Sequence, residues 1–321
     1  MMVVNMDIKK GRIQSLFQYN KSKIAPLLGL VLLVVFFAIT SKGKLLEASS
    51  IENIYNQGFP LLITSLAFVY VMATGNLDFS IGANVGFCAT IACYVAFFNT
   101  KLAFPAALLT GALVGLINSL MYVFLKIPSF IACLCMMFIL TAANQTLTGG
   151  GSKMVPVELL QNDYSIVRLV LLLIYIIIIV IIFHKTKVGK QLEALGISVE
   201  ASIQTGVNAK LLFIVSYVVT GVAAGLAGYL MLLRVGAASP TLGSSLTIDS
   251  IIALVLGGMS ILGGASSSMI CAVTGSLITT VLNSGIVLAG MGGDAQQLIK
   301  GALFIIVVSI STLRESSSKN F

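Results

Sequence analysis

Long apolar runs separated by short polar gaps dominate this chain of 321 residues. A helix that crosses a membrane needs about 20 mainly apolar residues, and the runs have that size. They lack the alternation of polar and apolar residues that marks barrel strands. The sequence therefore predicts an all-α, polytopic membrane protein with about ten transmembrane helices. The expected spans are residues 24–40, 59–73, 79–98, 102–125, 129–147, 166–183, 211–233, 248–262, 269–288 and 297–313.

The charged residues support a membrane setting and argue against nucleic acid as a partner. They make up only 9% of the chain, whereas a soluble domain has roughly 25%. The net charge of +8 comes from basic residues that flank apolar runs and do not form a face with aromatic residues. We therefore expect contact with membrane lipid and no contact with nucleic acid.

The distribution of lysine and arginine predicts the orientation of the chain. The Lys-rich segment 1–23 is expected in the cytoplasm, and it lacks the small-residue pattern of a cleaved signal. Alternation through ten spans then brings Lys126, the polar loop 185–210 and the tail 314–321 to the same side. The sequence predicts a cytoplasmic N-terminal segment, one transmembrane domain over 24–313, and two cytoplasmic termini.

Residues that could support metal binding or catalysis are sparse. The five cysteines lie in apolar runs and are interpreted as small buried hydrophobic residues. His184, the only histidine, has no second ligand at a suitable spacing, so no metal site is expected. The sequence contains no phosphate-binding loop, nucleophile elbow or zinc-protease motif. We expect no enzymatic activity, no bound cofactor and no metal in this chain.

Two of the expected spans are short and run into glycine-rich polar segments. Residues 59–73 lead into TGNLDFSIG, and residues 248–262 pass through GGMSILGG into ASSS. Spans two to five and seven to ten would form two groups of opposite orientation, each with one such interruption. Paired interruptions of this kind are typical of inverted repeats that surround a transport pathway. Hydropathy and position carry this prediction.

Several polar residues near these interruptions have two interpretations. A carboxylate at the bilayer centre costs roughly 2.5 to 3.5 kcal/mol, so Asp78 is expected near an interface or a wet cavity. Asp78 or Ser80 could cap the following helix, or this break could line a pathway or support a gate. Lys300 could simply extend to the lipid headgroups, or it could join Asp249 or Arg234 in an ion pair at the outer surface.

The loop 185–210 has an amphipathic pattern. Its apolar residues recur at three or four positions and would share one side of a helix, with acidic residues beside them. Gly196 and Gly206 are expected to limit the loop to short helices. Such a loop is shaped to dock onto a partner. The apolar residues are Leu192, Leu195, Val199, Ile203 and Val207.

Three glycines in the span 211–233 predict close helix packing. Gly221, Gly225 and Gly228 follow one another at spacings of four and three residues. Small residues at such spacings let one membrane helix approach another closely. We interpret them as packing residues.

Several stretches together resemble the permease subunits of bacterial ABC importers for ribose and related simple sugars. GNLDFSIGANVG resembles the family's GGIDLSVGS stretch, with Asn76 in place of a second glycine. IPSFIACLCMMFIL, the loop from Thr186 to Asn208, and IDSIIALVLGGMSILGG resemble three further family stretches in the same order. The resemblance extends over nearly the whole chain.

The resemblance implies a fold like that of the vitamin B12 importer permease, with about ten helices and a pathway between two permease subunits. It implies two ABC ATPase subunits that bind ATP and Mg in the cytosol, a substrate-binding protein outside, and a location in the bacterial inner membrane. ATPase docking is expected at Glu193, Leu195, Gly196, Val199, Glu200, Ile203 and Gly206, with Leu195 and Val199 as the main contacts. A pathway or gate is expected at Asn76, Asp78, Ser80, Asp249, Ser260 and Lys300.

Some alternatives stay open at this point. Ser198 and Gln204 depart from the family's usual Asn and Arg, which leaves both a homodimer and a heterodimer of permeases possible. The solute could be a pentose, a hexose, a nucleoside or a sugar-like signalling molecule. An ion-coupled secondary carrier is the main alternative from another class, because ten helices and an inverted repeat fit it as well.

Overall fold

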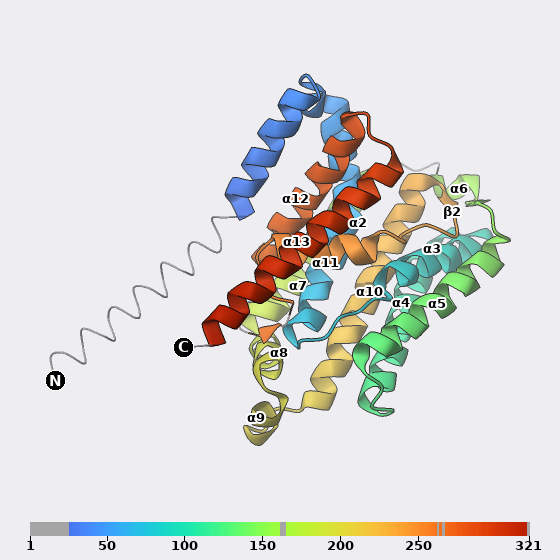
Figure 1. Ribbon diagram of the computed structural model, residues 1–321. Helices are drawn as coiled ribbons and strands as arrows, with labels where there is room; N and C mark the ends of the chain where they lie inside the picture. Colours follow the sequence, from blue (N-terminus) through green and yellow to red (C-terminus); the bar gives the residue numbers. More distant parts are fainter. Residues whose placement is uncertain (1–25, 161–164, 262, 265–266, 320–321) are drawn as a thin grey trace.

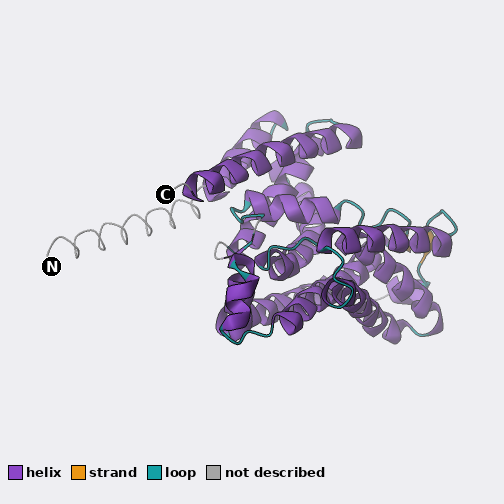
Figure 2. Cartoon of the chain, turned by 60° about the horizontal axis from the view of Figure 1, so that its bottom comes forward, coloured by secondary structure: helices purple, strands orange, loops and turns teal. Residues whose placement is uncertain are grey.

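The computed structural model describes residues 26–160, 165–261, 263–264 and 267–319, which form a bundle of helices (Figure 1). Figure 2 shows that loops and one short pair of strands complete the described part of the chain. The bundle confirms the all-α membrane fold that the sequence predicts.

Every predicted span coincides with an apolar helix in the described residues. Seven helices are long and apolar enough to cross a membrane, and the stretches Pro26–Thr40, Leu246–Leu256 and Ala295–Ile306 are shorter. The long helices are α2 (Ala48–Ala73), α3 (Ile81–Phe98), α4 (Thr100–Val123), α5 (Ser129–Thr148), α7 (Ser165–Lys185), α10 (Ala209–Val235) and α12 (Met269–Leu288). The shorter stretches include α11 (Leu246–Leu256) and part of α13 (Gly293–Lys319).

The first of the two interrupted spans is longer than the sequence predicts. α2 has 26 residues and begins at Ala48, so the prediction of a short second span is wrong. Its first turns carry exposed polar side chains such as Glu52 and Asn53, so they do not belong to the apolar run. α11 has only 11 residues, or about 16 Å at 1.5 Å per residue, and cannot cross the bilayer alone.

Short elements lie at both ends of the bundle. α8 (Lys187–Ile197) and α9 (Val199–Gln204) project at one end, which we call the α9 end (Figure 1). The ribbon of β1 (Lys153–Met154) and β2 (Ala237–Ala238) lies with α6 (Val157–Leu160) at the opposite end, the ribbon end. A turn of 3₁₀ helix, η1 (Lys44–Leu46), precedes α2.

The packing of the helices follows an approximate twofold pattern. α2 and α10 run in opposite directions and pack together (Figure 1). α4 packs on α10 as α12 packs on α2, and α3 packs on α10 as α11 packs on α2. α5 contacts α3 and α4, while α13 makes the corresponding contacts with α11 and α12. These paired contacts are those of an inverted repeat, which the order of the spans predicts.

The dipeptide Asn-Ser occurs in each of the two halves. Asn118 and Ser119 lie in the last two turns of α4, and Asn283 and Ser284 lie in the last two turns of α12. α4 and α12 are partners in the twofold pattern. The dipeptide therefore occupies related positions in the two halves.

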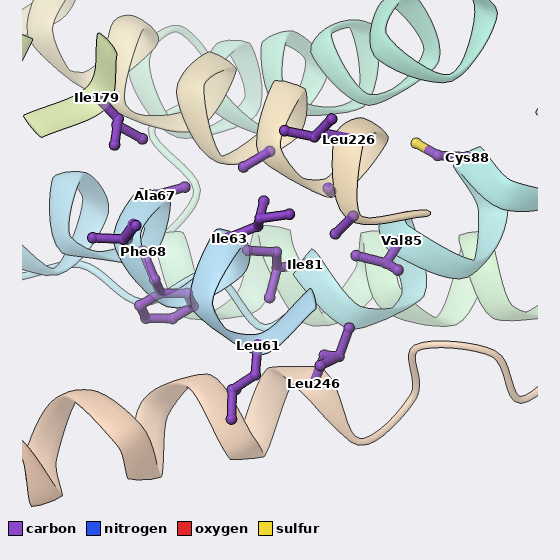
Figure 3. Packing of buried hydrophobic residues seen from close by; sticks show 14 of the residues in the cluster. Leu61, Ile63, Ala67, Phe68, Ile81, Val85, Cys88, Ile179, Leu226 and Leu246 are labelled. Carbon is purple, nitrogen blue, oxygen red and sulfur yellow. The ribbon is translucent and has the colours of Figure 1, made fainter. Parts of the chain in front are cut away.

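The centre of the bundle is apolar and dense. Figure 3 shows Ile63 of α2, Ile81 and Val85 of α3, and Leu226 of α10 in one cluster. The Tyr70 hydroxyl, which is fully buried, donates to the Ile179 carbonyl at 2.7 Å and so joins α2 to α7. Nearly every residue in the second half of α2, from Pro60 to Ala73, is buried.

Glycines bring α4 and α10 into backbone contact. A Cβ at Gly111 would overlap the carbonyl oxygen of Gly221, and a Cβ at Gly115 would overlap that of Tyr217. A Cβ at Gly225 would overlap the Ala107 carbonyl in the same way. The packing interpretation of the α10 glycines is therefore confirmed.

We expect Gly111→Ala to lower the free energy of unfolding by about 1 to 3 kcal/mol, because the added methyl group pushes two backbones apart. Denaturant titration of the protein in mixed micelles measures this change. Gly301→Ala is the control, since a Cβ there meets nothing within 4 Å. Equal stability of the two variants would contradict the close backbone packing of α4 and α10.

Candidate functional site

The break between α2 and α3 is a non-helical segment inside the protein. Residues 74–80 connect the two helices, and Gly75 turns the chain with a φ of 77°. Asp78 and Ser80 are 3% and 1% exposed. Asn76 is half-buried and donates to the Thr74 hydroxyl at 3.0 Å. Backbone without regular hydrogen bonds is tolerated at membrane depth only where protein or a wet cavity surrounds it.

Asp78 holds this break to two helices. Its Oδ1 accepts from the Ser80 amide at 2.9 Å and from the Ser80 hydroxyl at 2.6 Å. Its Oδ2 accepts from the Thr220 hydroxyl of α10 at 3.4 Å. Asn118 of α4 donates to the Ser80 hydroxyl at 2.7 Å. Asp78 therefore orders the turn that precedes α3.

An amide in the first turn of α3 has its hydrogen-bond partner in the other half of the protein. Gly82 donates from its amide to the Thr247 hydroxyl of α11 at 2.9 Å, and this hydroxyl lies 3.3 Å from the Phe79 carbonyl. Neither Asp78 nor Ser80 makes this bond. Thr247 of α11 thus supplies part of the helix cap that the sequence suggests for Asp78 or Ser80.

The second break follows α11 and contacts the first. The helix ends at Leu256, and Gly258 and Gly263 have φ values of 96° and 75°. A Cβ at Gly263 would overlap the Met72 carbonyl at the end of α2. Ser260, a predicted pathway residue, is half-buried in this segment, whereas Leu262 lies outside the described residues.

α8 meets both breaks at one residue. A Cβ at Gly196 would overlap the Ala73 carbonyl at the end of α2, and it would also crowd the amide of Gly264 after α11. We call the contact of Gly196 with Ala73 and Gly264 the glycine junction. It connects the loop at the α9 end directly to the two interrupted segments.

The structure changes the predicted docking face of this loop. Leu192 and Leu195 are 0% and 1% exposed because they pack into the core of the chain itself. The prediction that Leu195 presents its side chain to a partner is therefore wrong. Val199 is also half-buried against that core. The spacings of three and four residues place these side chains on the side of the loop that faces the bundle.

The exposed apolar residues of this loop are different ones. Ile197 is 69% exposed and Ile203 is 55% exposed, with Glu200 and Gly206 also at the surface. Glu193 is half-buried, and this burial raises the pKa of its carboxyl, although Lys190 acts in the opposite direction. Ile197, Glu200 and Ile203 form what we call the loop patch.

Side-chain caps divide the loop into its short helices. The Thr186 hydroxyl accepts from the Val188 amide at 3.2 Å, and the Ser198 hydroxyl accepts from the Ala201 amide at 3.2 Å. Serine and asparagine are about equally effective as N-caps. Ser198 therefore serves as a cap of the same strength as the Asn usual in the resembling family.

A buried ion pair joins α11 to α13. The Lys300 ammonium lies 2.8 Å and 3.1 Å from the two carboxylate oxygens of Asp249. The two residues are 9% and 4% exposed, so the interpretation of Lys300 as a headgroup anchor is wrong. Arg234 does not complete this pair and instead donates to the Asn56 carbonyl at 2.8 Å. A gating role for Asp249 and Lys300 stays a prediction.

A polar cavity of about 280 Å³ opens beside this ion pair. Helices α2, α10, α11, α12 and α13 all contribute to its wall. Arg234, near the last residue of α10, places the cavity toward the ribbon end. The polar lining includes Gln57, Arg234, Asp249, Asn283, Gln296 and Lys300.

A polar contact that the sequence does not predict holds the loop 239–245. Asn144 of α5 donates to the Ser239 carbonyl at 3.0 Å and to the Pro240 carbonyl at 3.2 Å, and accepts from the Thr90 hydroxyl. The available signal was the polar stretch at the end of an expected span, where Asn144 is followed by Gln145 and Thr146. A second cavity of about 80 Å³ lies here, lined by Met137, Thr141, Asn144, Pro240, Leu242 and Thr247, among others.

Comparison with known proteins identifies the family of this chain. The model of the family described as "Branched-chain amino acid transport system / permease component" matches residues 50–308. The chain belongs to this family. The expected resemblance to permease subunits of bacterial sugar ABC importers is confirmed, and the chain is a multi-pass membrane permease.

Curated relatives cover most of the chain. The galactofuranose transporter permease protein of Escherichia coli K12 is 30% identical over 87% of this chain and 84% of its own. The fructose import permease protein of Rhizobium meliloti is 31% identical over 92% and 86%. The autoinducer 2 import system permease protein of Escherichia coli K12 / DH10B is 29% identical over 91% and 87%. No solved structure matches the chain.

We expect Lys300→Met to lower the free energy of unfolding by about 3 to 5 kcal/mol, because it leaves the Asp249 carboxylate buried without a counter-charge. The double variant Asp249→Asn, Lys300→Met removes both charges and should lie within about 1 kcal/mol of the wild type. Unfolding in mixed micelles measures all three proteins. A double variant that is less stable than the single one would show that the two residues do not act as a pair.

Proposed function

We propose that this permease is the translocation subunit of an ATP-driven importer that moves a sugar or sugar-like solute across the bacterial inner membrane. The glycine junction is the observation that carries the mechanism, since it joins the loop at the α9 end to both breaks. The names of the relatives support the solute class, because they include galactofuranose, fructose and autoinducer 2 permeases.

The proposed complex contains two permease subunits, two ABC ATPase subunits and an extracytoplasmic substrate-binding protein. The ATPase subunits bind and hydrolyse ATP with Mg, and this chain binds neither. The α9 end faces the cytosol, as the lysines at 185, 187, 190 and 210 favour, and both termini lie on that side. The ribbon end then faces the substrate-binding protein.

The loop patch is the proposed contact with the ATPase. Large apolar side chains such as Ile197 and Ile203, exposed in a cytosolic loop, favour a protein partner, and Glu200 supplies a charge at the edge. Glu193 and Gly206 flank this patch, while Leu192, Leu195 and Val199 hold the loop to the bundle from its other side.

Movement of the loop reaches the membrane through the glycine junction. Backbone contacts at Gly196 leave no flexible side chain between α8 and the end of α2, or between α8 and Gly264 in the segment after α11. A displacement of α8 by the ATPase therefore displaces the two breaks together. Alternation of the breaks between two positions would open the pathway first to one side and then to the other.

The surface of α5 supports a pathway between two permease subunits. α5 exposes the polar residues Thr141, Gln145 and Thr146. α7, by contrast, exposes valine, leucine and isoleucine over most of its length, as a lipid-facing helix does. Polar groups are costly against lipid, so the exposed side of α5 fits a subunit interface or a wet pathway. The partner is a second copy or a related permease.

The solute itself is proposed only as a class. The names of the relatives above give galactofuranose, fructose and autoinducer 2, and a nucleoside is the alternative that fits the same family resemblance. The ion-coupled carrier has no counterpart among these relatives. ATP-driven uptake by the reconstituted complex tests the proposal, and uptake that follows an ion gradient without ATP would reject it.

We expect the double variant Ile197→Asp, Ile203→Asp to lose most ATPase recruitment, because it places two charges in the proposed apolar contact. Co-purification of the ATPase with the permease, together with ATP-driven uptake, measures the loss. Met154→Asp is the matched control, since Met154 is 75% exposed at the ribbon end. Full recruitment of the ATPase by the double variant would reject the loop patch as the docking surface.

A further inference from the structure

The polar cavity beside Asp249 and Lys300 has the chemistry of a solute site. Its wall combines a carboxylate, an ammonium group, the guanidinium of Arg234, amide side chains and hydroxyl groups. We infer that this cavity binds one monosaccharide-sized, polyhydroxylated molecule within a single permease subunit. The inference rests on the proposed function and adds a binding site to it.

The ion pair gives the wall both kinds of hydrogen-bonding group. A carboxylate only accepts and an ammonium only donates, whereas a sugar hydroxyl does both. The Lys300 ammonium contacts the Asp249 carboxylate at 2.8 Å, and Lys300 also lines the cavity. Sugar hydroxyls can therefore bind next to the pair without either charge losing its partner.

Amide side chains complete the lining from two further helices. Asn283 of α12 has a buried Oδ1 with no hydrogen-bond partner, and Asn283 lines the cavity. An unpaired buried acceptor is costly unless a solute or water donates to it. Gln57 of α2 and Gln296 of α13 supply two more amides on the same wall.

The size of the cavity limits the solute. Ligand pockets in proteins range from about 300 to 1,000 Å³, and the cavity of about 280 Å³ lies just below this range. A cavity of this volume suits one sugar ring and not an oligosaccharide. Pro60, Leu61, Met231 and Leu246 provide the apolar part of the wall, which can contact the C–H faces of a ring.

The related position in the other half of the protein holds a chain of side-chain hydrogen bonds. There the Asn118 amide donates to the Ser80 hydroxyl, and Ser80 in turn donates to Asp78. The Oδ1 of Asn118 and that of Asn283, its counterpart in α12, are both buried without a hydrogen-bond partner. Of the two, Asn283 lines the polar cavity beside the ion pair.

Binding to the purified permease in lipid nanodiscs tests the inference. The probes are D-galactose, D-fructose and D-ribose, each titrated while the thermal unfolding midpoint is measured. We expect saturable stabilisation by at least one of the three sugars. Asn283→Leu and Gln296→Leu should weaken that binding about tenfold, because each keeps the side-chain volume and removes hydrogen-bonding groups. Asn53→Leu, at an exposed position outside the cavity lining, should leave it unchanged.

A labelling experiment covers the case in which a leucine variant fails to fold. Gln57→Cys places a thiol on an exposed residue of the cavity wall, and the stabilising sugar should slow its reaction with a membrane-impermeant maleimide. Equal stabilisation of the wild type and both leucine variants would overturn the inference, and so would unchanged labelling or the absence of any stabilising sugar. ATP-driven uptake by the complex with no sugar binding to the permease would reject this site alone, whereas absence of uptake would reject the proposed function.

Discussion

The permease depends on one constraint, which is that every backbone amide and carbonyl inside the membrane must find a partner within the protein. Helices satisfy this constraint by themselves, but the breaks after α2 and α11 do not. Asp78 accepts the amide of Ser80, and Thr247 accepts that of Gly82. The first break is thus closed by its own Asp78 and by Thr247 from the other half of the chain. The second break packs against the end of α2 at Gly263, so the two halves meet at both interruptions.

The same constraint explains why the two halves pack so closely. Gly111 and Gly221 bring the backbones of α4 and α10 into contact, and Gly263 does the same for the second break and the end of α2. Lipid tails are as apolar as the side chains, so the hydrophobic effect does not drive membrane helices together. Close backbone packing and polar contacts have to hold these helices together. The Tyr70 bond to the Ile179 carbonyl adds α7 to this arrangement.

Hydropathy predicted the number and order of the helices, because the cost of burying charges limits each span. It missed the start of α2, since the exposed turns around Glu52 lie outside the apolar run and still continue the helix. The direction of the loop's apolar face was also missed. Periodicity shows that Leu192 and Leu195 share a side, but only tertiary packing shows that this side faces the bundle. The pairing of Lys300 with Asp249 likewise depends on how α11 and α13 meet.

The glycine junction and the loop patch separate two roles within a few residues. Gly196 contacts the bundle through backbone atoms, whereas Ile203 lies on the surface, and Ile197, although 69% exposed, has its Cγ1 beside Gly264. Surface residues of α9 such as Ile203 can therefore change without altering the glycine junction. One consequence concerns engineering: under the proposed mechanism, exchanging α9 for that of another permease redirects this subunit to a different ATPase while the junction stays intact.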